Sequence, residues 1–80
     1  MHDLINVFPN PTHDLVNFCF SGFPPFNMKA EVLDMDGNIQ IIRNIDSQNP
    51  TLNLSGLPPS LYLIRLWEGH NVYMIKIFRY

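Results

Sequence analysis

The chain has 80 residues, 46% of them hydrophobic, which is enough for one small domain with a single modest core. Charged residues make up only 15% and the formal net charge is −2, so no basic face is expected for binding nucleic acid. The lone Cys19 excludes an internal disulfide, and no stretch reaches the roughly 20 apolar residues that span a membrane as a helix.

Alternating apolar residues and regularly spaced turns indicate an all-β fold. Apolar side chains recur with a period near two, and turn-forming residues arrive about every 8–12 residues, as in a sandwich or barrel. We predict strands at Leu4–Phe8, Asp14–Phe20, Lys29–Leu33, Asn38–Asn44, Thr51–Leu54, Leu61–Trp67 and Val72–Tyr80. The predicted fold class is a two-layer sandwich of about seven mainly antiparallel strands, formed by residues 1–80 as a single domain.

Proline and glycine clusters separate these strands. Pro9 and Pro11 cannot donate to a ladder, so they end the first strand and blunt its free edge. Pro24 and Pro25 make "SGFPPFN" a connector. Further turns are predicted at Asp46–Pro50, at "SGLPPS" and at "EGHN".

The pleat assigns side chains to faces, because successive residues of a strand point to opposite sides. The predicted inward residues are Val32, Leu52, Leu54, Tyr62, Ile64 and Leu66, with Arg65 pointing outward. On the last strand Tyr73, Ile75 and Ile77 share one face, and Met74, Lys76 and Phe78 share the other. At least one face of that strand is expected to be buried.

The stretch "LDMDGN" could be a calcium loop or the turn of a hairpin. If Gly37 takes the sixth position of an EF-hand loop, Asp34 and Asp36 fall on ligand positions. The first and twelfth positions then fall on Val32 and Arg43, so two strong ligands are missing. Asp-Gly is instead a strong hairpin signal, because a two-residue type I′ turn needs positive φ at both central residues. We predict the hairpin and no metal site.

Residues with reactive side chains form no recognisable catalytic site in the sequence. His13-Asp14, Cys19 and Ser21 contain the ingredients of a hydrolytic site, but neighbouring residues on a strand point to opposite faces. His13 is therefore expected to be a solvated turn residue, and Cys19 a small, partly buried one. His2, His13 and His70 lack any metal-ligand spacing. From its chemistry the chain is a non-enzymatic β-domain without a cofactor.

Two further patterns have structural interpretations. Asn53-Leu54-Ser55 matches the glycosylation acceptor pattern, which is common by chance. Trp67, Tyr73 and Tyr80 could form a sugar-stacking strip if they shared an exposed face. With so small a core, we expect these aromatic residues to pack within the sandwich instead.

Four stretches, read in order, resemble a known family: "INVFPNPTHDLVNF", "EVLDMDGNIQ", "LNLSGLPPSLYLIRL" and the closing "VYMIKIFRY". They resemble the type A C-terminal sorting domain of the type IX secretion system of Bacteroidota. That family's pattern is "YPNP" before a strand, a "D-x-x-G" hairpin, "L-S-x-L-x-x-G-x-Y" and a final strand with basic residues. The resemblance implies an immunoglobulin-like sandwich in which the matching positions are structural, namely Pro9, Asn10, Pro11, Asp34, Gly37, Leu54, Ser55, Gly56, Leu57 and Tyr62.

The resemblance also implies a function. Such a domain is a non-catalytic signal that directs attached cargo across the outer membrane through the type IX translocon, followed by cleavage by a sortase-like peptidase and cell-surface attachment. Met74 and Ile75 stand near where family members often carry basic residues, a departure that leaves Lys76 and Arg79 as the basic residues of this strand. Recognition by the translocon would fall on Lys76, Ile77 and Arg79. The protein would be a monomer that passes through the periplasm to the cell surface or the medium.

Two functional interpretations are open at this point. A sorting domain must be the last domain of its protein, so Tyr80 as the natural C-terminus would favour that interpretation. The alternative is an immunoglobulin-like accessory module of a secreted protein, either a spacer or a carbohydrate binder with a row of exposed aromatics. The start "MHDLINVF" is unlike a secretory signal peptide, so if the protein is exported, its signal peptide is expected upstream of this sequence.

Overall fold

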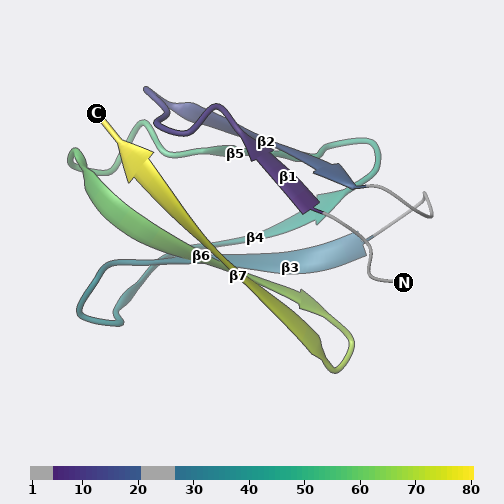
Figure 1. Cartoon of the computed structure of the whole chain (residues 1–80). Coiled ribbons are helices and arrows are strands. Elements are labelled where there is room, and N and C mark those ends of the chain that lie inside the picture. Colours follow the sequence, from purple (N-terminus) through teal and green to yellow (C-terminus); the bar gives the residue numbers. More distant parts are fainter. Residues whose placement is uncertain (1–4, 21–26) are drawn as a thin grey trace.

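The computed structural model describes residues 5–20 and 27–80, and within these ranges it contains strands and no helix (Figure 1). The strands are β1 (Ile5–Phe8), β2 (Leu15–Phe20), β3 (Asn27–Leu33), β4 (Ile39–Asp46), β5 (Thr51–Asn53), β6 (Ser60–Glu68) and β7 (Asn71–Arg79). Their order and bounds confirm the predicted strands with small shifts at the ends. His2, Leu4, Ser21 and the prolines of "SGFPPFN" lie outside the described residues.

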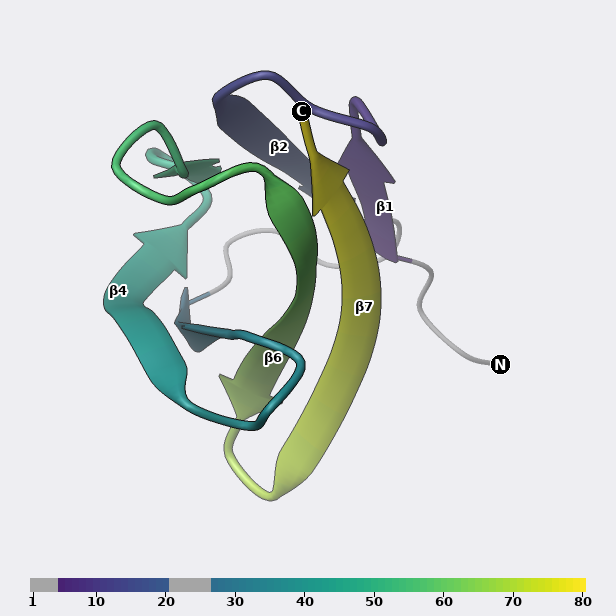
Figure 2. The ribbon, with the colours of Figure 1, turned by 90° about the vertical axis from the view of Figure 1, so that its left-hand side faces the viewer.

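The strands form two sheets, and every pair of neighbouring strands is antiparallel. One sheet has three strands in the order β1-β2-β5, and the other has four in the order β4-β3-β6-β7. Figure 2 shows the two sheets as separate layers, with β1 and β7 at the same side of the molecule. The predicted two-layer antiparallel sandwich is confirmed. The described part of the chain contains no helix that could span a membrane.

The core lies between the two sheets and follows the alternation in the sequence. Its buried members are Val16, Phe18, Met28, Ala30, Val32, Ile45, Leu52, Leu54, Tyr62, Ile64, Leu66 and Ile77. The predicted inward residues are all in this cluster, and Arg65 points to the outer face. Burying such side chains away from water is the main favourable term in folding.

Two predictions about individual side chains are wrong. Cys19 is exposed rather than partly buried, because it points away from the core on the uncovered face of β2, opposite Asn6 of β1. Among the three aromatics, only Tyr73 packs against the core. Trp67 lies on the outer face of the four-stranded sheet, next to Lys29 in the register, and Tyr80 is exposed.

Candidate functional site

The last strand, β7, separates its side chains as the alternation predicts. Ile77 is fully buried, and Tyr73 and Ile75 pack partly against the core. Met74 and Phe78 are about half exposed on the other face, at 52% and 47%. The strand therefore serves the core with one face and offers the other to solvent.

The three residues predicted to contact the translocon lie in different environments. Lys76 is exposed, and its side chain has no ionic partner among the described residues. Ile77 lies in the core, where a partner cannot touch it while the domain is folded. Arg79 is partly buried: its Nε donates to the Leu54 carbonyl at 2.8 Å and its Nη2 to the Ser55 carbonyl at 3.3 Å. Only Lys76 presents its side chain freely, and a recognition role for all three remains a prediction.

The "PNPT" segment lies along the outer edge of β7. Asn10 Nδ2 donates to the Lys76 carbonyl, and Asn10 Oδ1 accepts from the Phe78 N–H, both at 3.1 Å. Thr12 continues the contact: its N–H donates to the Phe78 carbonyl at 2.8 Å, and its carbonyl accepts from the Tyr80 N–H at 3.0 Å. We call this contact the edge seam, and it joins the two sheets at the C-terminal end of β7 (Figure 2).

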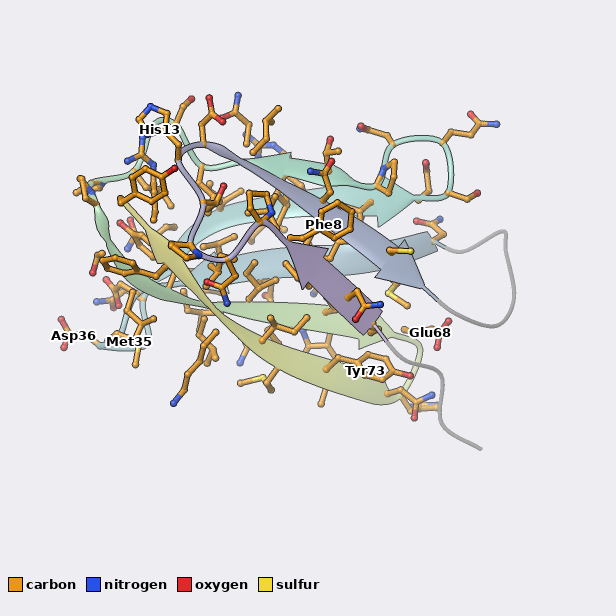
Figure 3. All side chains as sticks on the ribbon, turned by 45° about the horizontal axis from the view of Figure 1, so that its top comes forward. Phe8, His13, Met35, Asp36, Glu68 and Tyr73 are labelled. Atoms are coloured by element: carbon orange, nitrogen blue, oxygen red, sulfur yellow. The ribbon has the colours of Figure 1, made fainter. Side chains whose placement is uncertain are left out.

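Neighbouring side chains reinforce the edge seam. Thr12 is only 1% exposed, and its hydroxyl donates to the Leu15 carbonyl at 2.6 Å. The ring of His13 lies 5.5 Å from that of Tyr80, measured between centroids; Figure 3 shows His13 at this end of the molecule. His13 is exposed, as expected for a turn residue. Sequence reasoning missed the edge seam. The signal that could have indicated it is Asn10 between two prolines: the prolines lack an N–H, so the Asn10 side chain is the group available for hydrogen bonds.

The "LSGL" segment and Tyr62 form a second structural joint, between β5 and β6. Leu54 is fully buried, and its carbonyl accepts from the Leu57 N–H at 2.9 Å, which closes the turn. Tyr62 is 3% exposed, and its hydroxyl donates to the Pro58 carbonyl at 2.5 Å. A buried tyrosine that bonds back to the backbone a few residues upstream is also found in immunoglobulin-like sandwiches. Since Arg79 bonds to Leu54 and Ser55, this joint holds the end of β7 as well.

The hairpin between β3 and β4 forms as predicted, but its turn type differs. Gly37 has φ 89°, and no non-glycine among the described residues has positive φ, which excludes a type I′ turn. The Gly37 N–H donates to the Asp34 carbonyl and the Asp34 N–H to the Asn38 carbonyl, both at 3.0 Å. The loop is thus a three-residue connection that ends in a left-handed glycine.

The Asp34 carboxylate organises this loop instead of facing a metal. Its Oδ1 accepts from the N–H groups of Asp36 and Asn38 at 2.9 Å, and its Oδ2 from Gln40 Nε2 at 3.0 Å. The Asn38 backbone hydrogen bond is the main cause that lowers the pKa of Asp34 below its usual value. Met35 and Asp36 project from the tip of the loop (Figure 3). The described residues contain no group of His, Cys, Asp or Glu arranged to hold a metal ion.

The outer face of the four-stranded sheet carries a buried carboxylate that sequence reasoning missed. Glu31 is only 5% exposed, and its Oε1 accepts from Arg65 Nε at 2.7 Å and from Trp67 Nε1 at 2.6 Å. The Arg65 hydrogen bond, followed by that of Trp67, lowers the pKa of Glu31 below its usual value. The Arg65 guanidinium and Lys29 Nζ lie 5.6 and 5.8 Å from the Trp67 ring centroid. The alternation in the sequence places Glu31 and Arg65 on the outward faces of their strands. Their ion pair could not be predicted, because the sequence does not show that β3 pairs with β6.

A comparison with known protein families gives a match that spans most of the chain. Residues 6–78 match the secretion system C-terminal sorting domain. A comparison with curated proteins gives no match. The matched range contains the "PNP" segment, the Asp34–Gly37 turn, the "LSGL" joint, Tyr62 and most of β7. The chain therefore belongs to the family of type IX secretion C-terminal sorting domains.

Proposed function

We propose that this chain is a non-catalytic signal, folded as a single domain over residues 1–80, that directs attached cargo across the outer membrane through the type IX translocon. A sortase-like peptidase then removes the domain, and the cargo is attached to the cell surface. The domain acts as a monomer and passes through the periplasm on its way to the surface or the medium. The match to the sorting family over residues 6–78 is the observation that carries this proposal.

The positions of the family motif support it, because they build joints around the C-terminal strand. Asn10 bonds to the edge of β7, and the carbonyls of Leu54 and Ser55 accept from Arg79. Tyr62 packs its ring in the core beside Ile77, its partner in the register. A signal that must be read on many different cargoes needs such a rigid, self-contained frame more than it needs a reactive group.

Within this frame, Lys76 is the side chain that we assign to direct contact with the translocon. It is exposed on the same face of β7 as Met74 and Phe78, so it presents a charge between two apolar side chains. Ile77 supports recognition from inside, because its burial fixes the strand. Arg79 fixes the end of the strand through its two carbonyl contacts.

The test is a secreted reporter that carries a secretory signal peptide in front and residues 1–80 behind, expressed in a bacterium with a type IX system. We expect delivery to the surface or medium in this strain and periplasmic retention in a strain that lacks the translocon. A reporter without the appended domain is the control. Retention of the full fusion in both strains, with the domain folded, would overturn the proposal.

The accessory-module interpretation receives less support from the side chains. Trp67 and Tyr73 point to opposite faces of the sheet, since Tyr73 pairs with the buried Leu66 in the register. They cannot form one planar strip. A cavity of about 240 Å³ between β4 and β5 is lined by Arg43, Asn44, Asn49, Thr51, Leu52 and Asn53, without an aromatic residue for stacking on a sugar.

A further inference from the structure

The described residues cover the outer edge of β7 over only part of its length. The edge seam engages the Lys76 carbonyl, the N–H and carbonyl of Phe78, and the Tyr80 N–H. Backbone groups of alternate residues point to the same edge, and the register with β6 runs without a shift from Asn71 to Arg79. The N–H and carbonyl of Val72 and Met74 therefore point outward as well.

No described residue pairs with these outward groups. The ladder with β6 uses the backbone groups of Tyr73 and Ile75 instead, and no other hydrogen bond between described residues reaches Val72 or Met74. Their side chains are also accessible, with Val72 43% and Met74 52% exposed. An accessible strand edge of this kind is a template for pairing with another extended chain. We refer to the segment Val72–Ile75 as the open edge; it ends where the edge seam begins, at the Lys76 carbonyl.

The other edge of this sheet, along β4, is partly covered by one of its own side chains. The residues of β4 that pair with inward positions of β3 alternate with Ile42 and Asn44, whose backbone groups point outward. The Ile42 carbonyl already accepts from the guanidinium of Arg43 at 2.8 Å. A charged side chain folded onto an edge is a common protection against strand pairing.

We propose that the open edge receives an extended strand of the type IX export machinery by β-strand addition, an inference that rests on the proposed function. The edge seam is the internal precedent, because Thr12 already pairs with Arg79 as a parallel bridge on the same edge. A strand from the partner continues that pairing toward Val72. In this binding mode main-chain hydrogen bonds supply affinity, and pockets for alternate side chains supply specificity.

The surroundings of the open edge define the chemistry of the partner strand. Met74 on the outer face and the half-buried rims of Tyr73 and Ile75 on the inner face favour apolar side chains at the centre of the partner strand. The exposed ammonium of Lys76, which has no ionic partner among the described residues, favours a carboxylate opposite it. The expected partner is thus an apolar strand with an acidic residue near one end.

Hydrogen exchange on the 80-residue chain tests the premise without any export assay. We expect fast exchange at the amides of Val72 and Met74, and slow exchange at Tyr73 and Ile75, which pair with β6, and at Phe78, which pairs with Asn10. Protection of the Met74 amide equal to that of Ile75 would show that the edge is covered, and it would overturn the proposal whether or not the domain is a sorting signal.

The export reporter then tests the function of the edge with a matched pair of variants. Met74→Pro and Ile42→Pro each remove an outward N–H from an edge strand. Both side chains are about half exposed on the outer face. They lie at the two ends of one line of paired residues across the sheet, since Ile42 pairs with Glu31, Glu31 with Arg65 and Arg65 with Met74. We expect Met74→Pro to reduce export by about tenfold or more, because it removes a hydrogen bond and adds a clash. Ile42→Pro and Met74→Ala, which keeps the N–H, should export normally.

Each outcome has one meaning, provided that thermal unfolding shows the variants to be folded. Normal export of Met74→Pro overturns the edge proposal and leaves the sorting function intact, and equal loss in Ile42→Pro also overturns it. Failure of the unmodified fusion overturns both. If either proline variant does not fold, a photo-crosslinking amino acid at position 74, with Met35 as the exposed control position, replaces the pair. An adduct with a translocon component at 74 alone supports the proposal, and its absence during active export overturns it.

Discussion

The side-chain amide of Asn10 is joined to the backbone of Phe78, with Asn10 Oδ1 3.1 Å from the Phe78 nitrogen. The same amide donates through Nδ2 to the Lys76 carbonyl. One side chain thus supplies a donor and an acceptor to a strand edge, as the backbone of a pairing residue would. Pro9 and Pro11 have no N–H to offer, so the Asn10 side chain supplies the contact to β7 until the backbone of Thr12 takes it over.

Removal of this amide should loosen the end of β7. We expect Asn10→Ala to lower the free energy of unfolding by about 1 kcal/mol, the net value of partly exposed hydrogen bonds, as measured by urea denaturation. Asn6→Ala is the control, because Asn6 is exposed on β1 and should change stability by less than about 0.5 kcal/mol. Equal effects of the two substitutions would show that the seam contributes nothing specific.

The glycine that closes the β3–β4 loop should tolerate little change. Gly37 has φ 89°, a conformation that a β-branched residue rarely adopts. Gly37→Val is expected to cost about 1–3 kcal/mol of stability, the usual range for a strained backbone position. Gly56→Ala is the control, since an added Cβ there meets no atom within 4 Å and φ is not positive; its unfolding midpoint should not fall.

The ion pair on the outer face should make stability depend on pH. Hydrogen bonds from Arg65 and Trp67 lower the pKa of Glu31 below its ordinary 4.5. A carboxyl with a lower pKa in the folded state stabilises fully above the unfolded pKa, and this contribution is lost as the pH falls through the folded value. Glu31→Gln should therefore destabilise by about 1–3 kcal/mol at neutral pH, and by progressively less as the pH falls below 4.5.

Urea denaturation at several pH values measures this difference. Glu68→Gln serves as the control, because Glu68 is exposed and has no ionic partner among the described residues. It should change stability by less than about 0.5 kcal/mol at any pH. A Glu31→Gln difference that stays constant down to acid pH would contradict the assignment.

The sequence predicted most of the fold because both of its signals are local. Alternation set the strand faces, and proline and glycine set their ends, so Tyr62, Ile64 and Leu66 were assigned correctly. What it missed depends on long-range pairing. The edge seam joins Asn10 to Phe78, and the ion pair joins Glu31 to Arg65. Neither is visible until the strand order places distant residues side by side.

The predictions of the turn type and of the burial of Cys19 were wrong because each depends on contacts outside the local pattern. Asp36-Gly37 fits a two-residue turn by composition, but the Asp34 carboxylate bonds the N–H groups of Asp36 and Asn38 and stabilises a wider loop. Cys19 was predicted to be partly buried from its position between two phenylalanines. It is exposed, because it lies on the outer face of β2, and the sequence alone does not show which face of a strand is covered.

Calcium should not stabilise the protein. The oxygens of Asp34 already accept hydrogen bonds from Asp36, Asn38 and Gln40, so a cation would have to displace them. A site occupied well above its dissociation constant would add a few kcal/mol, about 2.7 at a hundredfold excess. We expect the same melting temperature with millimolar calcium and with chelator. A rise that the chelator reverses would show that the loop binds the ion.

The last strand allows folding and recognition to be separated residue by residue. Ile77→Asp places a carboxylate in the core and should unfold the domain, because an unpaired buried charge costs several kcal/mol. Arg79→Ala should cost about 1–2 kcal/mol, since it removes the hydrogen bonds to Leu54 and Ser55. Lys76→Ala should leave stability within about 0.5 kcal/mol, because the side chain is exposed.

Export of the reporter should not follow the same order. Lys76→Ala is expected to reduce delivery although the domain stays as stable as the original, because it removes the charge that we assign to translocon contact. Lys29→Ala is the matched control: Lys29 is also an exposed lysine on the outer face, but it lies on β3, away from the last strand. Delivery that falls only in proportion to lost stability, with Lys76→Ala and Lys29→Ala both exported normally, would show that β7 contributes through folding alone and that Lys76 is not read by the machinery.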